Sequence, residues 1–150
     1  MTPNATYRRF ELIVFDWDGT LSDSTRTIVR SIQHACRDMA LEVPDDTQAA
    51  YVIGLGLHEA LKVVAPALAP ELYAQLGALY RRHYVTRQHE LSLFPGALDL
   101  LQGLKDRRHR LAVATGKTRL GLDEALRNSK LQALFDSTRT ADETASKPDP

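Results

Sequence analysis

Two aspartates one residue apart, Asp16 and Asp18, directly follow the short apolar run 12–15. A short apolar run that ends in acids and glycine is typical of a buried parallel strand that stops at a site. In open α/β sheets, ligands bind beyond the carboxyl ends of the strands. Two carboxylates at that place can hold a divalent cation of the magnesium type, and one of them can attack phosphorus, because aspartates form aspartyl-phosphates.

The same stretch contains the pair Asp18-Gly19, which is also a strong signal for the turn of a β-hairpin. A hairpin needs a second alternating strand just after the turn. Residues 24–40 instead repeat apolar side chains at helical spacing, among them Ile32 and Cys36. The sequence therefore favours an acidic site over a simple turn.

The composition is that of an ordinary globular protein and argues against several classes of partner. The 150 residues are 43% hydrophobic and 25% charged, and Lys+Arg and Asp+Glu balance at 19 each, so we expect neither nucleic acid nor an anionic membrane as partner. The single cysteine, Cys36, excludes an intrachain disulfide and a cysteine-built zinc site, and we expect it to pack in a helix. The first ten residues hold no apolar stretch of signal-peptide length, and no run is long enough to span a membrane, so we expect a cytoplasmic protein.

The apolar spacing predicts an α/β core interrupted by a helical insertion. Strands are expected over about 10–15, 110–114 and 134–139. Helices are expected over 24–40 (capped by Asp23 or Ser24), from Pro44, over 57–64 and 70–89, from Pro95 to about 108, and over 118–128. The alternating order implies parallel strands with right-handed crossovers. We therefore predict a Rossmann-like parallel sheet core, residues 1–23 and 91–150, and a helical segment, residues 24–90, inserted as a cap.

Gly54-Leu55-Gly56 breaks the helical pattern inside that segment. A dinucleotide-binding fingerprint would need a preceding strand and a third glycine where Glu59 stands, so that alternative is rejected. We expect a loop between two helices.

The parallel topology brings distant polar residues to one edge of the sheet. Asp16, Asp18 and Thr115 follow the first and second strands, so they can converge although nearly a hundred residues separate them. Phosphoryl transfer needs mainly positioning and charge neutralisation. An aspartate nucleophile, a second carboxyl for proton transfer, a hydroxyl with backbone N–H groups, and a lysine would meet that need.

Residues 115–118 have alternative interpretations. As the end of a nucleotide P-loop they would require a glycine where Leu111 stands, five residues before Gly116, so that motif is excluded. Thr115 could also be a helix N-cap, which is compatible with an anion site. Lys117 and Arg119 could contact phosphate or could be solvated charges, and the sequence leaves both open.

Three segments in order, 16–21 (DWDGTL), 114–117 (ATGK) and 146–150 (SKPDP), resemble the signatures of haloacid dehalogenase-like hydrolases. The similarity is greatest to the phosphoglycolate-phosphatase type. It spans the whole chain, because the helical segment fits the cap of that branch.

The resemblance implies a role for each matching residue. Asp16 would be the nucleophile and Asp18 the acid and base, while Thr115 would hold the phosphate and Lys147 would steady the negative charge. Magnesium would sit on the Asp16 carboxylate and the Asp18 backbone carbonyl. The further phosphate contacts would come from Trp17, Gly19, Thr20, Gly116 and Lys117. The loop Gly54-Leu55-Gly56 would help to choose the substrate, with hinges near Ser22 and Phe94.

One departure from the family pattern concerns the metal site. Such enzymes carry a further strand after the lysine, which ends in an acidic pair that completes the magnesium site. Here Asp142 and Glu143 precede Lys147 and cannot be that pair. We therefore expect an incomplete core that belongs to a longer enzyme. We also expect weak magnesium binding and slow or no turnover by the 150-residue chain, and an uncovered first strand that a partner or second copy could pair with.

The leading hypothesis is a magnesium-dependent phosphatase that hydrolyses a small phosphorylated metabolite through an aspartyl-phosphate. The alternatives are a phosphoglucomutase-like phosphoryl transferase and a catalytically silent binding module. A dehalogenase is disfavoured, because carbon–halogen chemistry does not require the acid/base Asp18. Phosphoglycolate is the substrate that the resemblance suggests, and sugar phosphates, nucleotides and pyrophosphate stay open.

Overall fold

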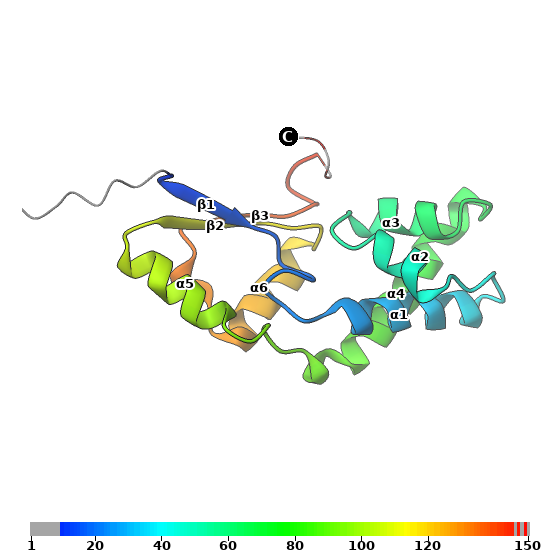
Figure 1. The fold of residues 1–150 in the computed structure, drawn as a ribbon. Helices are drawn as coiled ribbons and strands as arrows, with labels where there is room; N and C mark the ends of the chain where they lie inside the picture. The colour runs from blue at the N-terminus through cyan, green and yellow to red at the C-terminus, as the bar shows by residue number, and fades with distance from the viewer. Residues whose placement is uncertain (1–9, 146, 148, 150) are drawn as a thin grey trace, which may run out of the picture.

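A computed structural model describes residues 10–145, 147 and 149. Its centre is a sheet of three parallel strands in the order β1 (Leu12–Phe15), β2 (Arg110–Ala114) and β3 (Ser137–Arg139). Phe15 is level with Val113 in the register, so the residues that follow β1 and β2 leave the sheet at the same edge. The predicted α/β class and the parallel pairing are confirmed (Figure 1).

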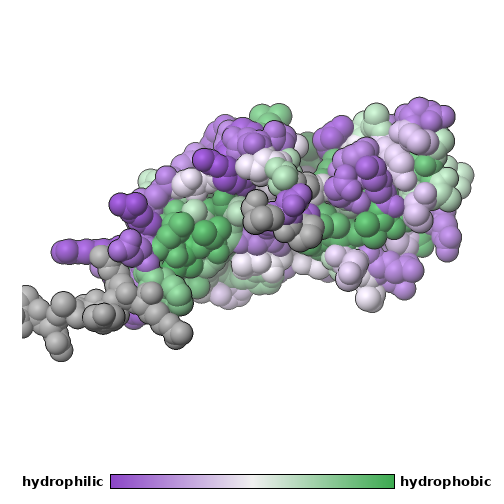
Figure 2. Space-filling view, turned by 90° about the horizontal axis from the view of Figure 1, so that it is seen from above, coloured by the Kyte–Doolittle hydropathy of each residue, from purple (hydrophilic) through white to green (hydrophobic). Residues whose placement is uncertain are grey.

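Two helices, α5 (Ala97–Asp106) and α6 (Arg119–Ser129), lie on one face of the sheet (Figure 1). Alternate side chains of β1 explain this arrangement: Ile13 and Phe15 pack into the core beneath the sheet, whereas Leu12 and Val14 point the other way and are 50% and 54% exposed. Figure 2 shows a hydrophobic area over this uncovered face. Within the described residues β1 pairs only with β2, so it is an edge strand, as predicted.

The helical segment has a hydrophobic core of its own and lies beside the sheet (Figure 1). It contains α1 (Thr25–Asp38), α2 (Asp46–Tyr51), α3 (Leu57–Val64) and α4 (Tyr73–Thr86), with 3-10 turns at Pro70–Leu72 and Gln88–Glu90. Ile32, Leu61 and Leu76 are buried at its centre, together with Cys36, as predicted for that cysteine. No helix of the described residues is long and apolar enough to cross a membrane.

The chain passes twice between the helical segment and the sheet, near Ser22 and near Phe94. These two crossings are hydrogen-bonded to each other. The Asp23 N–H donates to the Ser92 carbonyl at 2.8 Å, and the Phe94 N–H donates to the Leu21 carbonyl at 2.9 Å. The crossings therefore form a short antiparallel pair, at the place where the sequence predicts hinges.

Several predicted boundaries are wrong, for local reasons. The helix expected from Pro44 begins at Asp46, with Asp45 as its N-cap. The helix expected from Pro95 begins at Ala97, because Gly96 is its N-cap in a left-handed conformation (φ +81°). The long helix expected over 70–89 is shortened by a 3-10 turn at each end. The third strand is shorter than 134–139, because the chain forms a 3-10 turn up to Leu134 just before it.

Candidate active site

The loop after β1 is a tight turn built around the Trp17 carbonyl. That oxygen accepts the N–H groups of Thr20, Leu21 and Ser22 at 3.3, 3.0 and 3.0 Å, and the Gly19 N–H donates to the Ser22 carbonyl at 2.9 Å. Gly19 has φ +73°, which favours glycine. Gly19 and Thr20 are residues that we predicted as phosphate contacts, and their main-chain N–H groups thus donate within the turn. The indole of Trp17 is buried, so any phosphate contact from this residue would come from its main chain.

Asp16 meets the lysine that the sequence predicted as its partner. The Lys147 ammonium lies 2.9 Å from Oδ1 of Asp16, although 131 residues separate the two along the chain. Oδ2 of Asp16 faces the loop at Gly54, 3.7 Å from the point where a Cβ on that glycine would lie. Of the third signature, Lys147 and Asp149 are described and the other residues lie outside the described part.

Thr115 lies at the same sheet edge, one residue beyond the end of β2. It is buried, its N–H donates to the Arg139 carbonyl at 3.1 Å, and its Oγ accepts the Lys117 N–H at 3.2 Å. Its hydroxyl hydrogen can still be donated to an anion. The N-cap interpretation of Thr115 is wrong, because the cap of α6 is Thr118, whose Oγ accepts the Gly121 N–H at 3.2 Å.

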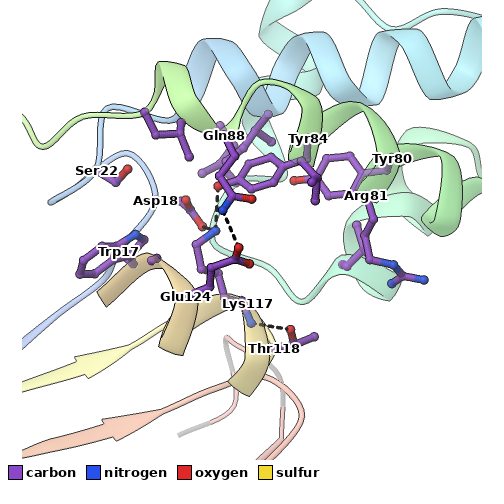
Figure 3. Close-up of a pocket in the computed structure, with 18 of the residues that line it drawn as sticks. Trp17, Asp18, Ser22, Tyr80, Arg81, Tyr84, Gln88, Lys117, Thr118 and Glu124 are labelled. Atoms are coloured by element: carbon purple, nitrogen blue, oxygen red, sulfur yellow. Dashed lines mark hydrogen bonds and ion pairs between the residues drawn. The ribbon is translucent and has the colours of Figure 1, made fainter. Parts of the chain in front are cut away.

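Asp18 is held from two sides. Its Oδ1 accepts a hydrogen bond from the Ser24 hydroxyl at 2.8 Å, and its Oδ2 lies 3.2 Å from the Lys117 ammonium (Figure 3). Both side chains of the ion pair are 12% exposed. Lys117 also donates to the Tyr84 hydroxyl at 3.0 Å and lies 4.8 Å from the centre of that ring. Lys117 is therefore a buried counter-ion that links the sheet to α4, and not a solvated charge.

Two of these contacts could not be read from the sequence. Ser24 was expected to cap α1 and is at the N-cap position, but its side chain makes no capping bond and turns to Asp18 instead. Tyr84 comes from the last turns of α4 and is 33 residues from Lys117. The helical spacing of Tyr80 and Tyr84, one turn apart, was the only available signal for an aromatic face.

Burial and charge shift the titration of this cluster. Burial lowers the pKa of Lys117, but the Asp18 carboxylate and the Tyr84 oxygen outweigh it, so the pKa lies above its ordinary value. Burial raises the pKa of Tyr84, and the Lys117 ammonium works in the opposite direction. Burial also raises the pKa of Tyr80 well above its ordinary value. At neutral pH the lysine is therefore charged, and both phenols are neutral.

The loop predicted to choose the substrate lies against the sheet edge. A Cβ on Gly116 would lie 2.2 Å from the Leu55 carbonyl oxygen and 2.8 Å from that of Gly54, so only glycine fits there. Gly54 itself has φ +99°, and Gly56 is the N-cap of α3. The loop thus touches both Gly116 and the surroundings of Asp16.

A cavity of about 460 Å³ lies between the helical segment and this edge of the sheet. Asp18, Gly116 and Lys117 contribute to its wall, and Tyr80 and Tyr84 face it from α4 (Figure 3). Asp16, Thr115 and Lys147 are not part of the wall. The acid/base candidate therefore borders the cavity, whereas the nucleophile candidate lies outside it.

The described residues contain no group of three or more His, Cys, Asp or Glu side chains that could hold a metal ion. Both oxygens of Asp18 already accept from donors. Oδ2 of Asp16 and main-chain carbonyls remain, which suits Mg²⁺, since this ion takes one or two protein carboxylate oxygens and fills its other positions with water and phosphate. The residues present therefore fit magnesium, with few protein ligands.

The acidic residues Asp142 and Glu143 form a separate cluster around Arg119. The Arg119 guanidinium lies 2.6 Å from Oε2 of Glu143, and the main-chain N–H of Arg119 donates to the Asp142 carboxylate at 2.9 Å. The Thr140 hydroxyl donates to Asp142 at 2.6 Å. Arg119 is thus a structural anchor for the segment between β3 and Lys147, rather than a phosphate contact.

The profile of the haloacid dehalogenase-like hydrolases matches residues 13–150. The chain belongs to this family. The resemblance of the three sequence signatures is therefore confirmed. The family's matched range begins within β1 and includes the whole site described above.

Individual relatives differ in their named activities. The tyrosine-protein kinase PtkA of Mycobacterium tuberculosis is 35% identical over 127 residues, which are 84% of this chain and 43% of PtkA. The phosphoglycolate phosphatase of Aliivibrio fischeri is 33% identical over 149 residues, or 94% of this chain and 66% of that protein. The solved structure of a haloacid dehalogenase-like hydrolase from Streptococcus pneumoniae has a TM-score of 0.73 at 24% identity, covers 87% of this chain and 60% of its own, and shows the common fold. The chain thus spans between 43% and 66% of the length of these proteins.

Proposed function

We propose that this chain carries the catalytic residues of a phosphatase that hydrolyses the monoester of a small phosphorylated metabolite through an aspartyl-phosphate on Asp16. The observation that carries the proposal is the 2.9 Å contact between Lys147 and Asp16, next to a second aspartate and a buried threonine at one sheet edge. An ammonium at this distance stabilises the charge of the nucleophile and of the group in transfer.

In the first step, the Asp16 carboxylate attacks phosphorus in line with the ester oxygen, and the P–O ester bond breaks. The leaving oxygen takes a proton from Asp18, which enters this step as the carboxylic acid and leaves it as the carboxylate, and the Thr115 hydroxyl and Lys147 hold the phosphoryl oxygens. In the second step, water gives a proton to Asp18 and attacks the aspartyl-phosphate. Asp16 is restored, and inorganic phosphate leaves.

Ser24 and Lys117 keep Asp18 pointing toward the cavity, because each binds one of its two oxygens. Magnesium would be held by the Asp16 carboxylate and the Asp18 backbone carbonyl, and would supply positive charge to the phosphate oxygens. In this proposal the helical segment is a cap, and the crossings near Ser22 and Phe94 are its hinges.

A second candidate is a phosphoryl transferase on the same site, which the similarity to a protein named a tyrosine kinase favours. It differs in the second step only, where a substrate hydroxyl replaces water as the attacking group. Measured phosphate release compared with transfer to a hydroxyl acceptor separates the two. A silent binding module would show neither reaction.

We also propose that a second copy can pair with the edge strand β1, since Leu12 and Val14 are exposed and no strand of the described residues pairs with its outer edge. Sedimentation velocity over a concentration series tests this, with Val14→Lys expected to favour the monomer. The cytoplasmic location and the absence of a nucleic-acid partner stay predictions from composition.

The experiment that tests the proposed function compares Asp16→Asn with wild type and with Asp99→Asn, an exposed aspartate on α5. At saturating magnesium, we expect Asp16→Asn to lower phosphate release by about a thousand-fold or more, and Asp99→Asn to leave it unchanged. Beryllofluoride with magnesium should raise the melting temperature of wild type but not of Asp16→Asn. Turnover retained in Asp16→Asn would remove the nucleophile.

A further inference from the structure

The cavity is large compared with the smallest candidate substrates. At about 460 Å³ it offers roughly fifteen places of water size. It also lies in the usual range for pockets that bind drug-sized molecules. The two-carbon acid of phosphoglycolate would leave most of it empty.

The volume is available to the organic part of the substrate. The residues that would handle the phosphate, Asp16, Thr115 and Lys147, are not part of the cavity wall, whereas Asp18 is. In the proposed reaction Asp18 gives its proton to the ester oxygen. The ester oxygen therefore marks the boundary, with the phosphate outside and the organic group inside.

The wall is mostly apolar on both sides. The helical segment contributes Ile32, Val52 and Leu57, and the side of the sheet contributes Leu93, Leu120 and Ala125. Placing a charged group against such side chains without a partner is costly.

The cavity wall offers few cations that could pair with a second negative charge on the substrate. Lys117 is already paired with Asp18. Arg81 is the other cation of the wall, and its guanidinium points away from Asp18 (Figure 3). A glycolate carboxylate would thus lack a free partner near the ester oxygen.

Two aromatic rings give the wall a flat face. Tyr80 and Tyr84 lie with their centroids 5.9 Å apart and their planes 29° apart, one turn apart on α4 (Figure 3). Aromatic ligands pack well against such faces. Gln88 and Glu124, which are hydrogen-bonded to each other at 2.7 Å, add neutral and acidic groups at the wall, which suit a hydroxyl or amide better than a second anion.

We propose that the substrates are phosphate monoesters whose organic group carries an aromatic or similarly flat apolar ring, and that this ring binds in the cavity against Tyr80 and Tyr84. The inference rests on the proposed function for the reaction itself. The binding of the ring does not depend on catalysis, and so it can be tested alone.

The binding test uses 1-naphthol, which has the ring but no phosphate, and follows its fluorescence on titration with the 150-residue chain. We expect saturable binding that Tyr80→Ala weakens about tenfold or more. Tyr51→Ala is the matched control, because Tyr51 is 81% exposed on α2 and not part of the wall. Ala125→Leu, which fills the cavity from α6, should weaken binding as well and serves if Tyr80→Ala does not fold. Binding that none of the cavity variants alters would overturn the inference.

The kinetic test compares 2-phenylethyl phosphate with phosphoglycolate, because both release a primary alcohol. We expect kcat/KM to be at least about tenfold higher for the aromatic ester. A preference for phosphoglycolate would overturn the inference and leave the phosphatase intact. Hydrolysis of neither ester at saturating magnesium, together with naphthol binding that depends on Tyr80, would refute the proposed function and support the cavity assignment.

Discussion

Replacing Gly116 by alanine tests the contact between the substrate loop and the sheet edge. The new Cβ would lie 2.2 Å from the Leu55 carbonyl oxygen and 2.6 Å from its carbonyl carbon. Ordinary contact begins at 3.4 Å, so the loop would have to retreat by about 1.2 Å, the difference between the two distances. Both atoms belong to the backbone, and therefore no rotamer change can relieve the clash.

Overpacking of this kind costs about 1–3 kcal/mol, which for a chain of this length corresponds to a fall in melting temperature of roughly 2–12 °C. Gly103→Ala is the matched control, since Gly103 lies in α5 and a Cβ there meets no atom within 4 Å. Inside a helix that substitution should stabilise the protein by about 0.5–1 kcal/mol. The two glycine-to-alanine changes are thus expected to have opposite signs.

Urea denaturation of the three proteins gives the free energies of unfolding. Because the loop also lies beside Asp16, Gly116→Ala should lower kcat/KM for any substrate that is hydrolysed, whereas Gly103→Ala should not. A Gly116→Ala protein as stable as wild type would show that the loop at Leu55 does not lie against Gly116, and the contact between this loop and the sheet edge would have to be abandoned.

Three further predictions concern charges. Lys117→Met leaves the buried carboxylate of Asp18 without its counter-ion and should lower the free energy of unfolding by about 3 kcal/mol. In the Lys117→Met background, Asp18→Asn should lower that free energy by about 1–3 kcal/mol less than it does in wild type. Additive losses in this double-mutant cycle would contradict the ion pair. Hydrogen bonding by Arg119, opposed by partial burial and aided by Thr140, lowers the pKa of Glu143 from 4.5 to about 2. The stabilisation from Glu143 is therefore complete above pH 4.5 and is lost as the pH falls toward 2, so Glu143→Gln should flatten the melting temperature against pH in that window, and Glu71→Gln, at an exposed site, should not. Calorimetric titration should show that the 150-residue chain binds magnesium only in the millimolar range, because few protein ligands converge on Asp16, and micromolar binding would contradict the site.

The placement of Asp16 and Thr115 could be predicted from the sequence because strand order alone determines it, whereas the role of Lys147 came from the family resemblance. Parallel strands joined by crossover helices must end at the same edge, and the residues just after them must meet there. The structure brings Lys147 to Asp16 across 131 residues without any local signal linking the two.

The contacts of Asp18 could not be predicted from the sequence, for a physical reason. Whether Ser24 caps its helix or turns to a carboxylate depends on how α1 enters from the crossing, and both choices satisfy the hydroxyl. The contact of Lys117 with Tyr84 depends on how the helical segment docks on the sheet. Packing between two hydrophobic cores decides that docking, and apolar periodicity describes each core only separately.

The most direct test of the central claim is to identify the residue that carries the phosphoryl group during turnover. The chain is mixed with substrate at saturating magnesium, quenched, reduced with borohydride and analysed by peptide mass spectrometry, because borohydride converts an aspartyl-phosphate to homoserine. A phosphoryl group carried by Asp16 predicts homoserine at position 16 in wild type and none in the Asp16→Asn protein. Homoserine at another aspartate, or phosphate release with no modified residue, would contradict it.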